Sequence, residues 1–295
     1  MNYSLINRSV ISGNDLVGES AKKWDLYKYL LGNGVAYYYC KKLSFVRNDF
    51  EADIVRVGEE FNKKYIRTLR LIDKMCKRAK IKYLLFKTYK YVDEVVDGDV
   101  DIIVRGRDFA EFMRLFEGEG FDCEETEPLK GLCIKKGYCK LEPRVDISFY
   151  GSVYVDEEQM WVGKERVNVD GVSVWKVAKE LDVLYFLLNV LYGPNYLKLY
   201  SYLLLVGLDL GSAVEYLKSE KTKGEVVRYY LKLVADVDYD VRFPVFVGNW
   251  DYLVFWVRSV RAVKALMFFF YCKYQYVLFG NLVFQHDWRL KYNLS

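Results

Sequence analysis

The sequence is poor in the residues on which several kinds of functional site depend. Its 295 residues include four prolines, six cysteines and a single histidine, His286. One histidine cannot build a histidine-rich metal centre, and a Ser-His-Asp triad would have to recruit this residue from the far end of the chain. No cysteines show the close pair spacing of a zinc site; they are Cys40, Cys76, Cys123, Cys133, Cys139 and Cys272.

Export and membrane signals are also lacking. The amino-terminal segment MNYSLINRSV is polar and has no apolar run of the signal-peptide kind. The most apolar stretch, 265–284, is interrupted by Lys273 and contains Gln275 and Asn281, so it falls short of the about 20 apolar residues of a spanning helix. We therefore expect a buried aromatic helix there, no membrane partner, and a cytoplasmic protein with reduced thiols. Many Lys, Glu, Tyr and Val residues with few Gln are typical of heat-adapted proteins from thermophiles.

What is present indicates a globular protein with a sizeable core. Apolar residues make up 52% of the chain and charged residues 28%, and the net charge of +4 is too small to imply a nucleic-acid partner by itself. Hydrophobic periodicity changes near residue 170, from mixed helical and strand-like patterns to helical ones. We expect an amino-terminal helical segment at 1–50, a mixed domain at 51–170 and a helical domain at 171–295.

The patterns predict individual elements in each part. Helical segments are expected over 21–47 and 52–80. Strands are expected at Ile81–Phe86, Asp99–Val104, Leu132–Lys136, Tyr138–Glu142 and Arg144–Tyr150, with a helix at Asp108–Glu117 and a turn at Gly137. Further helices are expected at Val174–Tyr192, Tyr196–Val206, Ser212–Lys218, Gly224–Val234 and near Trp250–Leu278.

An aspartate pair in the strand Asp99–Val104 is the most informative feature. Asp99 and Asp101 lie two residues apart, so both side chains project from one face, while Val100 and Ile102 project from the other. Neighbouring carboxylates repel, and burying them unpaired is costly. A divalent cation such as Mg²⁺ resolves this conflict, because it prefers oxygen ligands.

A third carboxylate, Asp146, is flanked by Val145 and Ile147 on another predicted strand. If that strand lies beside the aspartate pair, three carboxylates can hold two Mg²⁺ ions about 3.5–4 Å apart, an arrangement that supports in-line nucleotidyl displacement. Asp146 would be the general base or a ligand of the second ion.

A calcium loop is the competing interpretation of the acidic run that begins at Asp97. Such a loop requires glycine at its sixth position and glutamate at its twelfth, where this chain has Ile102 and Asp108. The calcium interpretation therefore fails. An aspartate pair on its own remains a weak signal.

Taken in order, these pieces resemble the DNA polymerase beta nucleotidyltransferase superfamily, and above all its minimal prokaryotic and archaeal members. The matching segments are FKT (Phe86–Thr88), GDVDIIV (Gly98–Val104) and VDISFY (Val145–Tyr150), within a resemblance that spans roughly 52–206. The resemblance implies an α+β fold, a mixed sheet flanked by helices, with a catalytic domain at 51–170 and an all-helical carboxyl-terminal region. It also implies an NTP substrate such as ATP, Mg²⁺, and transfer of a nucleoside monophosphate with loss of pyrophosphate.

The sequence departs from the family pattern in two segments. Lys87 and Thr88 stand where the family has glycine followed by glycine or serine, and Ser148 stands where it often has histidine. Thr88 can offer a hydroxyl and Lys87 a positive charge to a triphosphate, but the backbone freedom of glycine is lost. The departure favours a second hypothesis, a catalytically inactive module that acts as a binding or antitoxin-like scaffold.

Basic side chains supply candidates for the rest of the site. If the strand of Asp146 continues back through Pro143, Arg144 and Lys140 share its face and can bind the triphosphate. A simple surface ion pair is the alternative interpretation.

A longer basic pattern lies on the helix 62–80, which has eight basic residues and one acidic residue. Five of them recur at spacings of three and four and form one stripe: Lys63, Arg67, Arg70, Lys74 and Lys77. Such a stripe suits a polyanion, so the acceptor is predicted to be tRNA or another RNA, with a protein or small molecule as alternatives. A solvated face balanced by acidic neighbours would give the same pattern.

Overall fold

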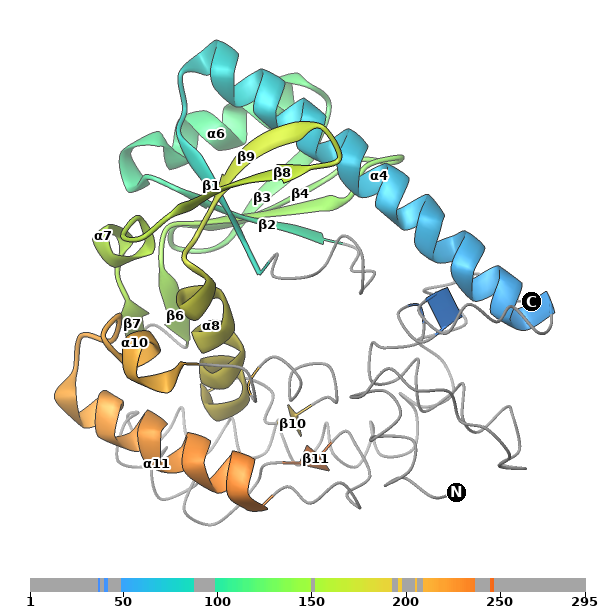
Figure 1. Cartoon of the computed structure of the whole chain (residues 1–295). Coiled ribbons are helices and arrows are strands. Elements are labelled where there is room, and N and C mark those ends of the chain that lie inside the picture. The colour runs from blue at the N-terminus through green and yellow to red at the C-terminus, as the bar shows by residue number, and fades with distance from the viewer. Residues whose placement is uncertain are drawn as a thin grey trace. The chain divides into compact units, whose positions relative to one another are not determined.

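The computed structural model describes most of the central part of the chain (Figure 1). The described residues are 49–87, 99–149, 152–192, 196–197, 205, 209–236 and 245–246, together with Tyr37, Cys40 and Lys41. The chain divides into two compact units, and one of them, which we call the sheet unit, comprises Val46–Leu187 and Leu204–Val234. Within the described residues, no helix is long and apolar enough to cross a membrane.

A seven-stranded mixed sheet forms the centre of the sheet unit, with the strand order β3-β4-β5-β2-β1-β9-β8. Strand β2 is antiparallel to β1 and parallel to β5, and β1 is parallel to β9. The strands are β1 (Tyr83–Phe86), β2 (Asp99–Val104), β3 (Asp122–Glu127), β4 (Lys130–Ile134), β5 (Lys140–Arg144), β8 (Glu165–Val169) and β9 (Val172–Lys176). The predicted α+β class, a mixed sheet flanked by helices, is confirmed.

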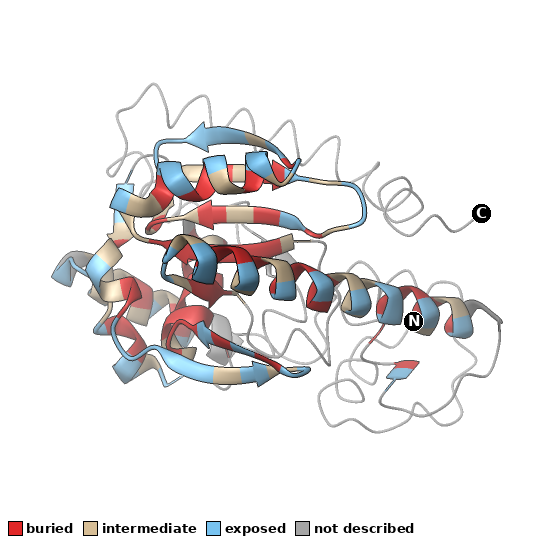
Figure 2. Cartoon of the chain, turned by 90° about the horizontal axis from the view of Figure 1, so that it is seen from above, coloured by how far each residue is buried: buried red, intermediate tan, exposed pale blue. Residues whose placement is uncertain are grey.

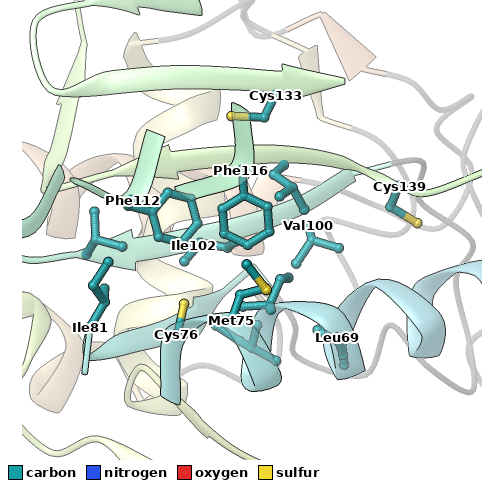
Figure 3. Close-up of a cluster of buried hydrophobic side chains, with 14 of the residues drawn as sticks. Leu69, Met75, Cys76, Ile81, Val100, Ile102, Phe112, Phe116, Cys133 and Cys139 are labelled. Carbon is teal, nitrogen blue, oxygen red and sulfur yellow. The ribbon is translucent and has the colours of Figure 1, made fainter. Parts of the chain in front are cut away.

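Two helices, α4 (Asp49–Ala79) and α6 (Gly106–Gly118), contribute their apolar sides to the main core. Leu69 and Cys76 of α4 are fully buried, as the three-and-four spacing of its apolar residues predicts. They share this cluster with Phe112 and Phe116 of α6 and with Ile102 of β2 (Figure 3). The face of β2 opposite to its aspartates is therefore covered by these helices.

Smaller elements complete the two units. The sheet unit also contains the hairpin β6 (Ile147–Phe149) and β7 (Ser152–Val155), with α7 (Glu157–Met160), α10 (Leu210–Val214) and most of α11 (Glu220–Asp236). Helix α8 (Lys179–Tyr192) begins in the sheet unit and ends in the other unit. In that other unit, β10 (Tyr196–Leu197) pairs with β11 (Val245–Phe246).

The strand predicted over Arg144–Tyr150 is interrupted in the structure. Strand β5 ends at Arg144, Val145 and Asp146 form a bend, and β6 pairs with β7 in a separate two-stranded sheet. Burial still alternates through the bend, with Val145 and Ile147 buried and Asp146 half-buried. The sequence pattern could not reveal the interruption, because the bend preserves the alternation of a continuous strand.

The helix predicted from Val174 begins later than expected. Val172–Lys176 is strand β9, in which every second residue is buried, and α8 begins only at Lys179. Because β9 and the two-residue strands β10 and β11 lie beyond residue 171, the prediction of an all-helical region there is wrong for these segments. The helices predicted at Ser212–Lys218 and Gly224–Val234 overlap α10 and α11.

Other predictions fall wholly or largely outside the described residues. The run at Trp250–Leu278 lies entirely outside them, and of the segment 21–47 only Tyr37, Cys40 and Lys41 are described.

The expectation of reduced thiols is wrong for one pair of cysteines. Cys123 of β3 and Cys133 of β4 are directly opposite each other in the antiparallel register and form a disulfide. Cys40, Cys76 and Cys139 are also described, and their buried thiols are not part of a disulfide. Burial, with a smaller contribution from Asp73, raises the pKa of the Cys76 thiol to about 12.

Candidate functional site

The aspartate pair lies on the face of β2 that α4 and α6 do not cover. Val100 and Ile102 are packed in the apolar cluster, so Asp99 and Asp101 project from the opposite face, as predicted. The side chain of Asp101 is 9% exposed and that of Asp99 is 24% exposed. Asp101 is thus the more deeply buried carboxylate.

The strand register places Glu142, and not Asp146, beside this pair. In the parallel pairing of β2 with β5, Asp101 is opposite Glu142 and Asp99 is opposite Lys140. Asp146 follows four residues after Glu142, which corresponds to roughly 13 Å along an extended strand, and it lies in the bend beyond β5. The structure therefore offers Glu142 as the third carboxylate, and the predicted catalytic role of Asp146 stays a prediction.

Sequence reasoning missed Glu142 because it assigned this residue to the end of one strand and Arg144 to the start of another. A single strand over 140–144 would have placed Glu142 on the same face as Lys140 and Arg144. The alternating charges of the segment KLEPR were the available signal.

Three predicted cationic residues gather around the carboxylates. Lys87 Nζ lies 2.5 Å from Asp101 Oδ1 and 4.0 Å from Glu142 Oε2. Arg144 Nη2 lies 3.3 Å from the same Asp101 oxygen and 3.7 Å from Glu142 Oε2. Lys140 Nζ lies 3.8 Å from Asp99 Oδ2. With three carboxylates and three cations, the formal charges of this group cancel.

Aromatic rings line the buried part of this group. The Tyr185 ring lies 4.7 Å from Lys87 Nζ and 5.7 Å from the Arg144 guanidinium. Burial lowers the pKa of Lys87, but Asp101, with Tyr185 and Glu142, outweighs that effect and holds the pKa above the ordinary lysine value. Lys87 is therefore charged at neutral pH. The Nε of Arg144 is buried and has no hydrogen-bond partner among the described residues.

The end of β1 fixes the position of Lys87. The backbone of this residue is left-handed, with φ of +55°, a conformation that costs a residue with a side chain roughly 1–2 kcal/mol. Its backbone N–H donates a hydrogen bond to the carboxylate of Asp182, which is fully buried in the first turn of α8. Thr88, the other residue predicted to contact a triphosphate here, lies outside the described residues.

The three carboxylates are ligands of the kind that Mg²⁺ prefers, but in this structure they pair with lysine and arginine and are not arranged around a common metal position. Asp99, Asp101 and Glu142 supply carboxylate oxygens at neighbouring positions of β2 and β5, and such oxygens are preferred Mg²⁺ ligands. In the described part of the chain, no group of three or more acidic, histidine or cysteine side chains is placed to hold a metal ion. A metal ion at Asp101 would have to displace the ammonium of Lys87.

The basic stripe predicted on α4 is exposed. Every exposed residue between Phe61 and Lys80 is basic: Lys63, Arg67, Arg70, Lys74, Lys77, Arg78 and Lys80. Figure 2 shows that the buried side of α4 faces the sheet and that its exposed side faces away from it. The stripe and the carboxylates therefore lie on opposite sides of the sheet.

Acidic neighbours compensate only part of the stripe. Lys77 lies 2.7 Å from Asp73, Arg78 lies 3.6 Å from Glu119, and Arg70 lies 4.0 Å from Asp170. Arg67 and Lys74 form no ion pair with a described residue.

Comparison with known proteins shows a likeness to a solved structure. No protein-family model matches the sequence, and no curated protein matches it. Among solved structures, the chain is similar to the antibiotic-resistance factor ANT(2'')-Ia. The sequences are 13% identical, the match covers 58% of this chain and 97% of that one, and the TM-score is 0.39.

Proposed function

We propose that the sheet unit is a metal-dependent nucleotidyltransferase that transfers a nucleoside monophosphate from an NTP to a hydroxyl acceptor. The observation that supports this most is the register of β2 and β5, which gathers Asp101 and Glu142 around the same two cations, Lys87 and Arg144. Carboxylates can bind a divalent ion, and basic side chains can bind a triphosphate. The group therefore contains side chains of the two kinds that a metal–nucleotide complex requires.

Each residue of the group has a role in this proposal. Asp99 and Asp101 would hold Mg²⁺, with Glu142 or Asp146 as the third ligand. When bound, Mg²⁺ would neutralise phosphate charge and lower the pKa of the attacking hydroxyl. Arg144 would bind the triphosphate through its guanidinium, and the half-exposed Lys140 would add a second positive charge. Lys87 and Thr88 are further candidates for phosphate contact.

Label transfer tests this function. The full chain is incubated with each α-labelled NTP, Mg²⁺, and total RNA or cell lysate, and labelled acceptors are separated by electrophoresis. We expect labelling that stops when EDTA removes the metal and returns when Mg²⁺ is added. Absence of label with all four NTPs and every acceptor fraction would contradict the proposal.

A second candidate is a catalytically inactive binding or antitoxin-like module. The ion pair of Lys87 with Asp101 favours it, because this cation already neutralises the carboxylate on which a metal ion would depend. The two candidates differ in one measurement. An inactive module could bind an NTP, as followed by calorimetry, but would transfer no label to any acceptor.

The acceptor is proposed to be RNA such as tRNA, held by the basic stripe of α4, with a protein acceptor as the alternative. Charge reversal at the middle of the stripe, Arg67→Glu together with Arg70→Glu, should weaken RNA binding strongly and reduce the dependence of log Kd on log salt by about 2–4. The matched control is Arg56→Glu on the same helix, because Arg56 is exposed but already pairs with Asp53 and Glu60. Equal effects of the control and the stripe variant would remove the RNA proposal.

We propose a heat-adapted cytoplasmic source, because Lys, Glu, Tyr and Val are abundant in the sequence and Gln is scarce. The Cys123–Cys133 bond is compatible with it, because intracellular proteins of hyperthermophiles are unusually rich in disulfides.

A further inference from the structure

We propose that the outer hairpin of the sheet, formed by β8 and β9 (Figure 1), is a second RNA-contacting surface. It would hold a single-stranded segment, with a base against Trp175 and phosphates beside Lys164 and Arg166. We call these three residues the hairpin surface. The inference rests on RNA as the acceptor in the proposed function, and it names the part of the RNA that this surface takes.

The alternation of side chains along β9 places the hairpin surface on the same face of the sheet as the aspartates of β2. Val172 and Val174 are buried in the apolar cluster shared with α4 and α6, so Trp175 projects from the other face. In the register of β8 and β9, Arg166 is directly opposite Trp175, so its side chain projects from that face too. The basic stripe of α4, on the opposite side of the sheet, does not by itself bring RNA to this face.

The hairpin surface combines an exposed aromatic ring with cations beside it. Trp175 is 44% exposed. Lys164 Nζ lies 5.3 Å from the centre of the Trp175 ring and 5.5 Å from that of the Trp161 ring. Arg166 Nε donates a hydrogen bond to the Ser173 hydroxyl at 2.8 Å. Within the part of the chain that the structure describes, neither Lys164 nor Arg166 forms an ion pair, so no described carboxylate neutralises either charge.

Single-stranded RNA has the chemistry that this arrangement recognises. An unpaired base presents a ring face that can stack on a tryptophan, and the adjoining phosphates carry the negative charge that lysine and arginine attract. The bases of a duplex are already stacked on one another, so they do not offer a ring face to Trp175. A protein could also cover the ring, but the two cations without described acidic partners favour a polyanion.

The turn of the same hairpin contacts the basic stripe. Arg70 Nη2 lies 3.4 Å from the backbone carbonyl oxygen of Asp170 and 4.0 Å from its carboxylate. From this turn, the exposed residues Asn168 and Ser173, which are opposite each other in the register, lead along the strands toward Trp175. One RNA chain can therefore contact the stripe with one segment and the hairpin surface with another, passing around the sheet edge at β8.

The strand register also relates the hairpin surface to the candidate functional site. The pairings of β1 with β9 and with β2 make Trp175 level with Ile103 of β2, and Ile103 is opposite Arg144 of β5. Three strand spacings, or about 14 Å, therefore separate the backbones of Trp175 and Arg144. Ile103 is fully buried between them, so the hairpin surface and the candidate site are separate surfaces on one side of the sheet.

Binding of the full chain to a short fluorescein-labelled oligouridylate, followed by fluorescence anisotropy, tests the proposal. Trp175→Ala should weaken binding about tenfold, because it removes the stacking partner of one base. Trp175→Phe keeps an aromatic ring and should retain most of the affinity. The matched control is Leu231→Ala, since Leu231 of α11 is another exposed large apolar side chain, and its affinity should equal that of the wild type. An RNA duplex of the same length should bind Trp175→Ala and the wild type equally.

The two cations are tested by the salt dependence of the same binding. Lys164→Gln together with Arg166→Gln should reduce the slope of log Kd against log salt by about 1.4, because each phosphate contact with a single strand contributes about 0.7. The matched control is Arg114→Gln together with Lys136→Gln, which removes the same charge from exposed positions on α6 and in the β4–β5 turn. It should leave the slope nearly unchanged.

Equal oligouridylate affinity in the wild type and Trp175→Ala would overturn the proposal, and so would an equal loss in Leu231→Ala or an equal loss with the duplex. A wild type that does not bind oligouridylate would also overturn it and would leave the hairpin surface to a protein partner. If Trp175→Ala does not fold, as judged by circular dichroism, the salt slope of the cation variant decides the question.

Label transfer to RNA is measured in parallel, so that this proposal and the transferase function can fail separately. Loss of oligouridylate affinity in Trp175→Ala, without label transfer by the wild type, would leave the hairpin surface standing and contradict the transferase function. Label transfer to RNA with unchanged affinity in Trp175→Ala would do the reverse.

Discussion

The two faces of strand β2 are both buried, but they are held together by different forces. On one face, Val100 and Ile102 are at most 1% exposed and pack against side chains from α4 and α6. On the other face, Asp101 is nearly as buried and is surrounded by Lys87, Arg144 and Glu142. One strand of six residues thus separates an apolar core from a buried group of charges.

The two faces of β2 differ in how well they tolerate amino-acid substitutions. The apolar face is stabilised by area and packing, so a side chain of similar volume can replace another at modest cost. On the charged face, the loss of one group leaves its buried partner without a counter-ion, which is strongly destabilising. We therefore expect substitutions on the apolar face to affect only stability, and those on the charged face to affect stability and ligand binding together.

The largest loss of stability is expected from Phe112→Ala on the apolar face. Phe112 is fully buried and its ring centroid lies 4.7 Å from that of Phe116, so truncation leaves a cavity and should cost about 3–5 kcal/mol. Urea denaturation gives this value, and Phe112→Leu should cost clearly less. Mn²⁺ affinity of the folded Phe112→Ala variant should equal that of the wild type. A changed affinity would show that the two faces are coupled.

On the charged face, Asp101→Asn should destabilise the protein by about 3 kcal/mol, because it leaves Lys87 and Arg144 without their shared carboxylate. Label transfer and Mn²⁺ binding should be lost in the same variant. Asp99→Asn is the matched control, since Asp99 is more exposed and Lys140, which lies 3.8 Å from it, is half-exposed. It should change stability by less than about 1 kcal/mol while still impairing label transfer. Equal losses of stability would contradict the distinction between the two aspartates.

A substitution at Thr68 tests whether the apolar core is also destabilised by the loss of a buried hydrogen-bonding group. Thr68 of α4 is fully buried, donates to the carbonyl of Lys64 at 2.8 Å, and accepts from the backbone N–H of Cys139 at 3.0 Å. Thr68→Val should cost about 1–2 kcal/mol because that N–H loses its acceptor. Thr68→Ser keeps the hydroxyl and should cost less in the same denaturation assay. A larger loss of stability in Thr68→Ser than in Thr68→Val would show that the methyl group of Thr68 contributes more than its hydroxyl.

The smallest effect is expected from an ion pair that is partly exposed to solvent. Burial acts to raise the pKa of Asp156, but hydrogen bonds from Lys218 and the Gln159 backbone outweigh it, and the pKa lies below the ordinary value. Its contribution is therefore present above the unfolded pKa of about 3.9, and it is lost as the pH falls through the lower folded value. Asp156→Asn, which keeps a capping side chain for α7, should lower stability by less than about 1 kcal/mol at pH 7. The difference from the wild type should shrink below pH 4. A difference that persists at low pH would contradict the linkage.

Much of the charged face could be predicted from the sequence. Alternation in Asp99–Val104 correctly placed both aspartates opposite the apolar side chains, because a strand fixes that relation within a few residues. Lys87, Lys140 and Arg144 were also recognised as candidates, and the structure brings all three to the carboxylates. These predictions depended on local geometry and on the type of side chain.

What could not be predicted depends on contacts between distant segments. The choice between Glu142 and Asp146 is decided by the register of β5 against β2, and a strand's own sequence does not state that register. Likewise, the Cys123–Cys133 pair is set by the β3–β4 register, and a separation of ten residues carries no known spacing signal.

The most direct test of the site compares Glu142→Gln with Asp146→Asn in Mg²⁺-dependent label transfer by the full chain. Both changes remove one negative charge and keep nearly the same shape. If the register of β2 and β5 defines the site, Glu142→Gln should lower the transfer rate by at least about 100-fold and do so far more than Asp146→Asn. Full activity in Glu142→Gln together with loss in Asp146→Asn would contradict the account.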